Sequence, residues 1–372
     1  MALTQVETSG LSGSGSASNS TTGNVFSQTG PFKNRIINGD MRIDQRNAGA
    51  SVTPGASVTY TLDRWGASED TDGAATVIQD SSAPSGFSKS LKFTTTTADG
   101  SLSAAQFAAI VQYIEGQNVE DLAWGTASAK SVTLSFWVRS SLTGTFGGAI
   151  TNSAFNRSYP FTYSISSADT WEYKSVVIPG DTSGTWLVTN GVGVRVQFGL
   201  GVGSTYSGTA GAWAGSQYIS ATSAVSVIGT LNATFYITGV QLEAGSVATP
   251  FERRSYGQEL ALCQRYYFKQ TDATDNRFGV TGGGNTTTTR LITQFPVTMR
   301  TAPTSLSQTG TAANYKLIVG GVSQNCTAVP ALNAASVYST ETIFTSSSLT
   351  ASAAYVAWSD VANVFLAWSA EL

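Results

Sequence analysis

The stretch that decides the fold is GVQLEAGSVATPFERRSYGQELALCQRYY, residues 239–267. Apolar and polar residues alternate over residues 240–243, which predicts a half-buried strand. Gly245 then breaks the strand, and Pro250 excludes a helix before it, because the residue preceding a proline is pushed to extended geometry. A strand end, a turn and a charged patch therefore follow one another directly.

A short helix is predicted after this turn. Ser255 suits the N-cap position, although Gln258 rather than Glu stands at the third helical position. Apolar residues then recur at spacings of four, three and four, which defines one face of a helix: Tyr256, Leu260, Cys263 and Tyr267. Isolated helices of about 12 residues are marginal in water, so this helix needs packing partners.

The composition excludes several classes of function. The chain has 372 residues, of which only 12% are charged, against the roughly 25% typical of soluble proteins. The formal net charge is -3, and Arg253-Arg254 is an isolated basic pair, so the sequence has no electrostatic footprint for nucleic acid. The 38 glycines and the abundant Ser and Thr favour short strands and many turns.

Neither a membrane span nor a cofactor is predicted. No segment reaches the roughly 18 apolar residues of a spanning helix, and residues 1–10 lack the pattern of a secretory signal. Cys263 and Cys326 match no metal or redox spacing, so we expect no metal site, no disulfide and no membrane insertion.

The N-terminal two thirds of the chain begin with a polar tract and continue as strands. Residues 8–30 are rich in Gly, Ser and Thr, which is typical of either a disordered tail or an arm that orders on a partner. Residues 34–41, NRIINGDM, predict a hairpin around Asn38-Gly39. Later strands are predicted over residues 57–62, 75–79, 90–95, 131–140, 171–178, 193–200 and 234–242. Many short strands without a helical period predict a β-sandwich.

Residues 271–372 form a second β-rich unit. Its strands are predicted over residues 290–296, 315–319, 337–345, 353–358 and 364–368, with an extended connector over 298–303. Residues 276–290, NRFGVTGGGNTTTTR, predict a long polar loop at an exposed tip, or an edge strand over Thr286–Thr289 that pairs with another chain.

Several motifs, in order along the chain, resemble those of bacteriophage tail-fibre and receptor-binding proteins. The motifs are NRIINGDM at 34–41, DRW at 63–65, QYIEG at 112–116, LSFWV at 134–138, QLE at 241–243, ATPFE at 248–252, CQRYY at 263–267, FP at 295–296, MR at 299–300, AP at 302–303 and SAEL at 369–372. The resemblance implies an all-β chain: a jelly-roll β-sandwich similar to carbohydrate-binding modules of the galactose-binding type, a short linking helix and a smaller distal β-sandwich. It divides the chain into an attachment arm (1–33), the jelly roll (34–254), the linking helix (255–270) and the distal domain (271–372).

The resemblance also implies a function. Its members include homotrimeric tail fibres and tail-tip adhesins, structural proteins of the virion that are assembled in the host cytoplasm. The arm would then bind other tail proteins, and the β domains would bind a glycan or protein receptor on the bacterial surface. The alternative is a non-adhesive assembly component, such as a capsid decoration or tail-connector protein. Related jelly rolls hold calcium with an Asp in the last strand, but Thr238 or Gly239 stands there, so no metal site is carried over.

Catalysis is not expected. The chain has no His, which removes Ser-His-Asp and Cys-His nucleophiles and His-ligated zinc. A two-carboxylate glycosidase needs only acids, and the candidates are Glu69, Asp70 and Asp72, or Glu115, Glu120 and Asp121. Both groups lie in turn-like stretches where solvated acids are common, so we expect a binding protein.

Four residues are candidates for contact with a glycan. Trp137 points away from Leu134, Phe136 and Val138 and shares its face with Arg139, so it faces either a ligand or a neighbouring sheet or subunit. Tyr206 and Trp213 lie in a loop of small residues, where each is either a local plug or a recognition tip. The stripe of Tyr256, Leu260, Cys263 and Tyr267 is the candidate trimer interface.

Overall fold

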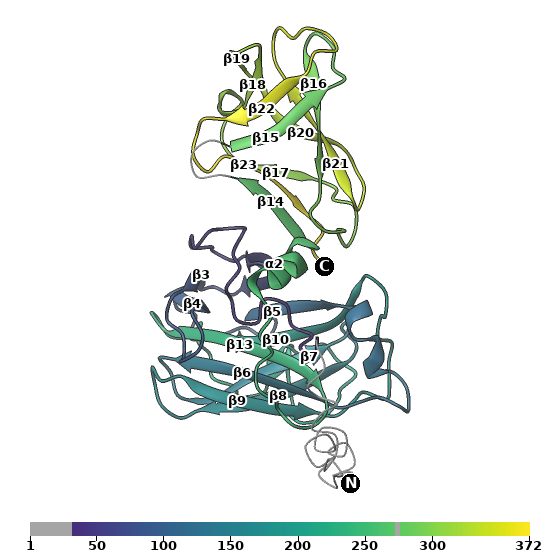
Figure 1. Cartoon of the computed structure of the whole chain (residues 1–372). Helices are drawn as coiled ribbons and strands as arrows, with labels where there is room; N and C mark the ends of the chain where they lie inside the picture. The colour runs from purple at the N-terminus through teal and green to yellow at the C-terminus, as the bar shows by residue number, and fades with distance from the viewer. Residues whose placement is uncertain (1–31, 272–275) are drawn as a thin grey trace, which may run out of the picture.

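The computed structural model describes residues 32–271 and 276–372. A large β-sandwich and a smaller β unit lie on either side of the helix α2, Tyr256–Gln264 (Figure 1). Both units are built from strands. The sequence prediction of an all-β chain with two sandwiches and a linking helix is confirmed.

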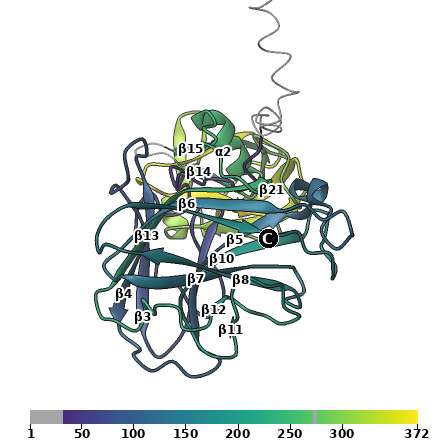
Figure 2. The same ribbon diagram turned by 90° about the horizontal axis from the view of Figure 1, so that it is seen from below.

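The large sandwich consists of two antiparallel sheets. The six-stranded sheet has the order β1-β2-β5-β10-β7-β8, with bounds Thr59–Leu62, Trp65–Asp70, Phe107–Glu115, Val192–Val202, Gly144–Thr151 and Ser158–Ile165. The five-stranded sheet has the order β3-β4-β13-β6-β9, with bounds Ala74–Asp80, Ser90–Thr97, Thr234–Ala244, Val132–Ser140 and Glu172–Ile178. Neighbouring strands are mostly distant in sequence, which is the connectivity of a jelly roll. A short parallel pair, β11 (Ser207–Gly208) and β12 (Ser220–Ala221), lies beside β7 and β8 (Figure 2).

The core of this sandwich follows from the alternation of its strands. Leu134, Phe136 and Val138 on β6 are fully buried, and the ring of Phe136 meets that of Phe198 from the opposite sheet at 5.1 Å. Trp65, the aromatic residue of the DRW motif, is also fully buried. Inward-facing aromatic and aliphatic side chains from both sheets therefore interdigitate in one cluster.

The smaller unit also has two layers. Its three-stranded sheet has the order β14-β23-β17, with bounds Tyr267–Thr271, Phe365–Ser369 and Leu306–Gln308. Its seven-stranded sheet has the order β19-β18-β22-β15-β16-β21-β20, with bounds Val322–Asn325, Lys316–Val319, Tyr355–Ser359, Asn276–Gly282, Thr288–Gln294, Ser339–Thr345 and Ala328–Ala335. Trp368, Tyr315 and Phe344 lie in the core between these layers.

The predicted polar loop at residues 276–290 is wrong. Residues 276–282 form β15, and β16 lies between β15 and β21 rather than at an edge. The reason is that Phe278 and Leu291 both point into the core, where they are 4% and 1% exposed. The run of Gly and Thr between them is a hairpin connection followed by the start of β16.

The hairpin predicted at residues 34–41 is also wrong. This segment contains no strand, and Asn38 and Met41 take positive φ angles of 56° and 59°. The buried amides at its centre bind side chains instead of a partner strand: the Ile37 amide donates to Gln112 at 2.8 Å, and the Asn38 amide donates to Glu259 at 2.5 Å. Side-chain acceptors thus replace the ladder that a hairpin would provide.

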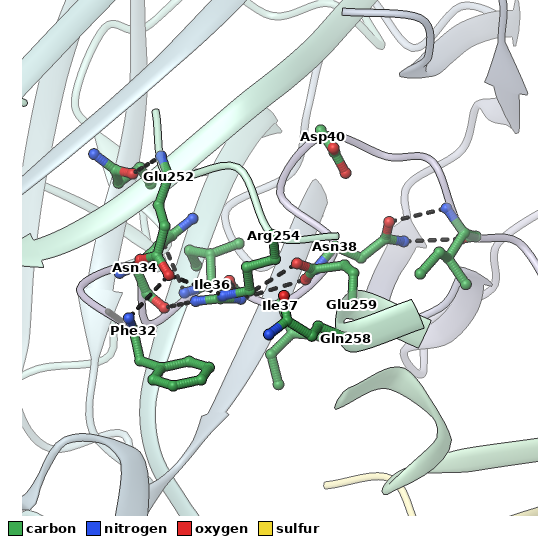
Figure 3. A network of polar contacts seen from close by, with 12 residues as sticks. Phe32, Asn34, Ile36, Ile37, Asn38, Asp40, Glu252, Arg254, Gln258 and Glu259 are labelled. Atoms are coloured by element: carbon green, nitrogen blue, oxygen red, sulfur yellow. Dashed lines mark hydrogen bonds and ion pairs between the residues drawn. The ribbon is translucent and has the colours of Figure 1, made fainter. Parts of the chain in front are cut away.

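Arg254 joins this segment to α2 (Figure 3). Its guanidinium forms ion pairs with Glu252 at 3.2 Å and Glu259 at 3.4 Å, and it donates to the carbonyl oxygens of Asn34 and Ile36. Arg254 and Glu259 are 9% and 5% exposed. The end of the jelly roll, the N-terminal segment and the first turns of α2 therefore share one buried charge network.

The two β units are joined by a second buried carboxylate. Glu115, at the end of β5, accepts from Arg265 at 2.6 and 2.9 Å and from the Tyr266 hydroxyl at 2.6 Å. Burial alone raises the pKa of Glu115, but the hydrogen bonds from Arg265 and Tyr266 outweigh it, so that the pKa lies below its ordinary value. The carboxylate therefore stays ionised and holds the residues between α2 and β14 against the sandwich.

We predict that Arg254→Ala lowers the free energy of unfolding by about 3–5 kcal/mol, because it leaves the Glu259 carboxylate buried without its cation. Urea denaturation followed by circular dichroism measures this difference. The matched control is the exposed neighbour Arg253→Ala, for which we expect a change within about 0.5 kcal/mol. Equal stabilities of the two variants would contradict a structural role for the Arg254 network.

Candidate functional site

A groove with aromatic walls lies on the outer face of the five-stranded sheet. Its hollow measures about 540 Å³. Strands β6, β9 and β13 form its floor, and the loop before β4 and the segment after β13 form its walls. The lining residues are Phe87, Ser135, Trp137, Tyr173, Gly239, Ala248, Thr249, Pro250, Phe251 and Arg253.

Trp137 lies on the floor of this groove because of the alternation along β6. Its neighbours Phe136 and Val138 point into the core, so Trp137 points outward and is half-buried. Its ring lies 5.5 Å from that of Tyr173, which is opposite it on β9 and 45% exposed. Two accessible aromatic rings therefore stand side by side on the sheet; the alternation along β6 predicts the outward position of Trp137 but not its pairing with Tyr173.

Gly239 shapes the floor beside these rings. The pairing of β13 with β6 shifts register between Thr238 and Gln241, and Gly239 takes a φ of +61° within this irregularity. A Cβ atom on Gly239 would lie 2.7 Å from the Phe87 ring and 3.1 Å from the Trp137 ring. Glycine is therefore required both for its backbone angle and for the close approach of two aromatic side chains.

Phe87, Phe251 and Arg253 form one wall. The rings of Phe87 and Phe251 meet edge to face, with centroids 5.3 Å apart. The Arg253 guanidinium lies over the Phe87 ring at 4.6 Å and donates to the Gly86 carbonyl oxygen at 2.6 Å. Arg253 is the one charged residue of the lining, and in the part of the chain that the structure describes no carboxylate forms an ion pair with it.

The loop that carries Phe251 is held by a buried acid. Glu243, which is 1% exposed at the end of β13, accepts from the Thr249 amide at 2.8 Å and from its hydroxyl at 2.6 Å. Three residues further, the Glu252 amide donates to Gln241 at 2.8 Å. The wall is thus fixed by the strand that also forms the floor, which favours a preformed site.

Arg139 lies on the same sheet face but does not line the groove. Its guanidinium donates to Ser82 at 3.0 Å and Asp169 at 3.2 Å, and it lies 4.9 Å from the centre of the Tyr236 ring. Arg139 therefore supports the loop before β4, which carries Phe87, from outside the groove.

The structure does not bring Tyr206 and Trp213 to this groove. The Trp213 ring packs among Trp124, Trp186 and Tyr159, and its indole N–H donates to the Pro179 carbonyl at 2.9 Å. It is therefore a local plug. Tyr206 packs against the Phe107 ring at 5.4 Å, beside the other sheet.

The stripe predicted as a trimer interface faces the interior of its own chain. Cys263 is fully buried with Ile37, Ile43 and Tyr266, and Tyr267 is 5% exposed in β14, beyond the end of the helix. These two residues cannot face a partner, and the prediction for them is wrong because Ile37 and Ile43 cover Cys263 and the Arg46 guanidinium lies 3.8 Å from the centre of the Tyr267 ring. On the same stripe Leu260 is half-buried against that cluster and Tyr256 is 55% exposed.

Four aromatic or charged residues of the groove were missed from the sequence. Phe251 and Arg253 lie within residues 239–267. An aromatic ring and a cation close together in this stretch are a signal that sequence reasoning could have combined with Trp137. Tyr173 stands between Glu172 and Lys174 along a predicted strand, so alternation would have placed its ring on the inner face, and the sequence carries no signal for its exposure. Phe87 follows Pro-Ser-Gly in a turn, and no local pattern indicates its neighbours.

Comparisons with known proteins give weak likenesses. No family model matches the chain, and no curated protein matches it. Among solved structures it is similar to the enzymatically active domain of tailspike protein 4 of bacteriophage CBA120, with 12% identity and a TM-score of 0.30 over 58% of this chain and 22% of that chain. It is also similar to a putative sugar binding protein from Bacteroides thetaiotaomicron, with 11% identity and a TM-score of 0.32 over 57% of this chain and all of that one.

A family 11 carbohydrate-binding module from Clostridium thermocellum, in complex with a mixed-linked tetrasaccharide, is similar as well. It has 12% identity and a TM-score of 0.27, over 55% of this chain and 100% of the module. Within the described residues, no helix is both long and apolar enough to span a membrane.

We predict that Gly239→Ala disturbs the groove at a cost of about 1–3 kcal/mol, because the new methyl group would need a positive φ and would press on Phe87 and Trp137. Tryptophan fluorescence and urea denaturation measure the two effects. Gly55→Ala is the matched control, since a Cβ atom there meets nothing within 4 Å. An unchanged emission spectrum and stability for Gly239→Ala would refute the packing described for the groove.

Proposed function

We propose that this chain is a structural virion protein, a homotrimeric phage tail fibre or tail-tip adhesin that binds a saccharide of the bacterial surface in the groove. The observation that carries the proposal is the pair of accessible rings, Trp137 and Tyr173, on the sheet floor beside the Phe87–Phe251 wall. Flat aromatic rings cover the C–H faces of sugars, while adjacent polar groups bind the hydroxyls. The phage role itself rests on the sequence motifs found in order between residues 34 and 372.

The charge of the groove favours an acidic saccharide. Arg253 is fixed over Phe87 and has no acidic partner within the described chain. A guanidinium in this position binds a carboxylate or phosphate group more strongly than a hydroxyl. We infer that the ligand carries an acidic substituent next to the sugar ring that stacks on Trp137.

Binding without catalysis is part of the proposal. Among the acids considered in the sequence, Glu115 is bound by Arg265 and Tyr266 and holds the two β units together. Glu69 accepts from the amide of Thr71 at 2.9 Å. These contacts give both carboxylates structural partners, and neither residue lines the groove.

We predict that Trp137→Ala lowers saccharide affinity at least tenfold and leaves the circular dichroism spectrum unchanged, because the ring is half exposed outside the core. An array of neutral and uronate- or phosphate-bearing bacterial oligosaccharides, probed with the labelled full-length protein, measures binding. Tyr338→Ala in the distal unit, where the ring is 64% exposed, is the matched control. Wild-type protein that bound no saccharide or bacterial cell would instead favour a decoration or connector protein.

A second variant tests the charge. We predict that Arg253→Gln lowers binding to acidic oligosaccharides about tenfold, corresponding to about 1.4 kcal/mol, and changes binding to neutral ones little. Wild-type binding should also weaken as the salt concentration rises, and binding by the variant should not. Equal losses of affinity for neutral and acidic oligosaccharides would show that Arg253 supports the shape of the groove and does not recognise the charge of the ligand.

A further inference from the structure

A hollow of about 320 Å³ lies between α2 and the connector from β16 to β17. Most of its lining is apolar, and the apolar residues are Phe32, Ala261, Leu262 and Val297. Arg265 is the one charged residue of the lining, and its guanidinium is already bound by Glu115. The hollow therefore suits an uncharged, apolar side chain.

Phe32, where the described chain begins, forms one side of the hollow. Its ring is 57% exposed, and its backbone takes a φ of 66°, which is unusual for a bulky residue. The Phe32 amide donates to Glu252 at 3.0 Å, and the Asn34 amide donates to the same carboxylate at 2.7 Å (Figure 3). Lys33 between them donates to the Pro250 carbonyl oxygen at 2.8 Å. These contacts hold residues 32–34 in place, so the segment before them starts at the edge of the hollow.

The segment before Phe32 carries one apolar motif. Residues 12–31 contain two large apolar side chains, Val25 and Phe26, and no charged residue. So polar a segment cannot bury a core of its own, and its two apolar side chains need another surface for burial. Phe26 precedes Phe32 by six positions, and six residues of extended chain reach about 20 Å. Both the reach of the segment and its lack of charge therefore match the hollow.

From these observations we propose that the hollow binds Val25 and Phe26 of its own chain and so anchors the N-terminal arm on α2. Covalent attachment favours this occupant over a second copy or another protein, because a short tether gives an effective concentration on the order of millimolar. The arm then leaves the protein at the joint between the two β units, with residues 1–24 available to other proteins. The inference rests on the hollow and on the sequence of the arm, and it applies equally to an adhesin and to an assembly component.

Chymotrypsin cleavage after Phe26, followed by mass spectrometry, tests the anchor on the full-length protein. The Ala261→Asp variant should be cleaved there about tenfold faster than the wild type, because a carboxylate in the hollow excludes the ring and opens the segment to the protease. Gly257→Asp is the matched control: it lies one turn earlier on α2, outside the lining, and a Cβ atom there meets nothing within 4 Å. It should be cleaved at the wild-type rate, and circular dichroism verifies that both variants are folded. Equal rates in the wild type and Ala261→Asp would overturn the proposal.

Disulfide trapping gives a second measurement that leaves the apolar motif intact. Cys263 and Cys326 are buried, so introduced thiols react with each other. Under mild oxidation, Ser27→Cys/Thr298→Cys should form a disulfide within one chain, because Thr298 lines the hollow and Ser27 follows Phe26. Adding Phe26→Ala should slow this linkage about tenfold, because the anchored population falls.

The control pair for trapping is Ser27→Cys/Val247→Cys. Val247 is 61% exposed and lies two residues before Thr249, to which Lys33 donates, so the tether can reach it although it lies outside the hollow. We expect little linkage of this pair. Equal linkage of both pairs, or disulfides between chains instead of within one, would overturn the assignment to the same chain.

Saccharide binding, measured on the same samples, separates this inference from the proposed function. The hollow and the groove share no lining residue, so Ala261→Asp should bind saccharide as the wild type does. A wild-type arm that is cleaved as fast as that of Ala261→Asp overturns the anchor alone. A protected arm on a protein that binds no saccharide supports the anchor and overturns the function proposed for the groove.

Discussion

The buried pair of Arg254 and Glu259 is the constraint on which the rest of the structure depends. Taking both charges out of water is costly, and the cost is offset only where every hydrogen-bonding position finds a partner. Here the partners are Glu252, the Asn38 amide and two carbonyl oxygens of the N-terminal segment. Because these partners lie in the N-terminal segment and at the end of the jelly roll, while Glu259 lies in α2, the pair can be satisfied only when all three parts are in place.

The buried Arg254–Glu259 pair also fixes one wall of the groove. The segment from Glu243 to Arg254 leaves β13, forms the wall that carries Phe251, and ends in the buried network. Its two ends are therefore fixed by acids and cations inside the protein, and only its middle faces solvent. A binding wall that is held at both ends loses little conformational entropy when a ligand binds. The groove is therefore a rigid site that lies directly beside the buried Arg254–Glu259 network.

The sequence predicted the elements well and their long-range contacts poorly. Period-two alternation identified β6, β10 and β13 and the outward position of Trp137. The reason is that the sequence of a single strand is enough to show which of its residues share a face. It could not show that the segment from Asn34 to Met41 binds side chains instead of forming a hairpin. Nor could it show that this segment covers Cys263.

The strands of the distal unit illustrate the same limit. Residues 276–290 are rich in Gly and Thr, so their composition predicts a loop, whereas the two buried side chains Phe278 and Leu291 determine a hairpin. The groove is formed where β6, β9, β13 and two loops come together. Local sequence patterns do not specify which distant strands and loops are neighbours, so they could not predict the groove. What the sequence did contain was the glycine at 239, whose positive φ and crowded surroundings became visible only in the structure.

The proposed groove suits an adhesin that binds through several copies of the chain. An open groove with one cation and a few rings binds a sugar weakly, because much of the ligand stays in water. The proposed homotrimer would present three grooves, so that the second and third contacts become intramolecular and the overall affinity rises by orders of magnitude. The Glu115 contacts with Arg265 and Tyr266 fix one β unit against the other, so each groove of such an assembly would keep a constant position relative to its distal unit.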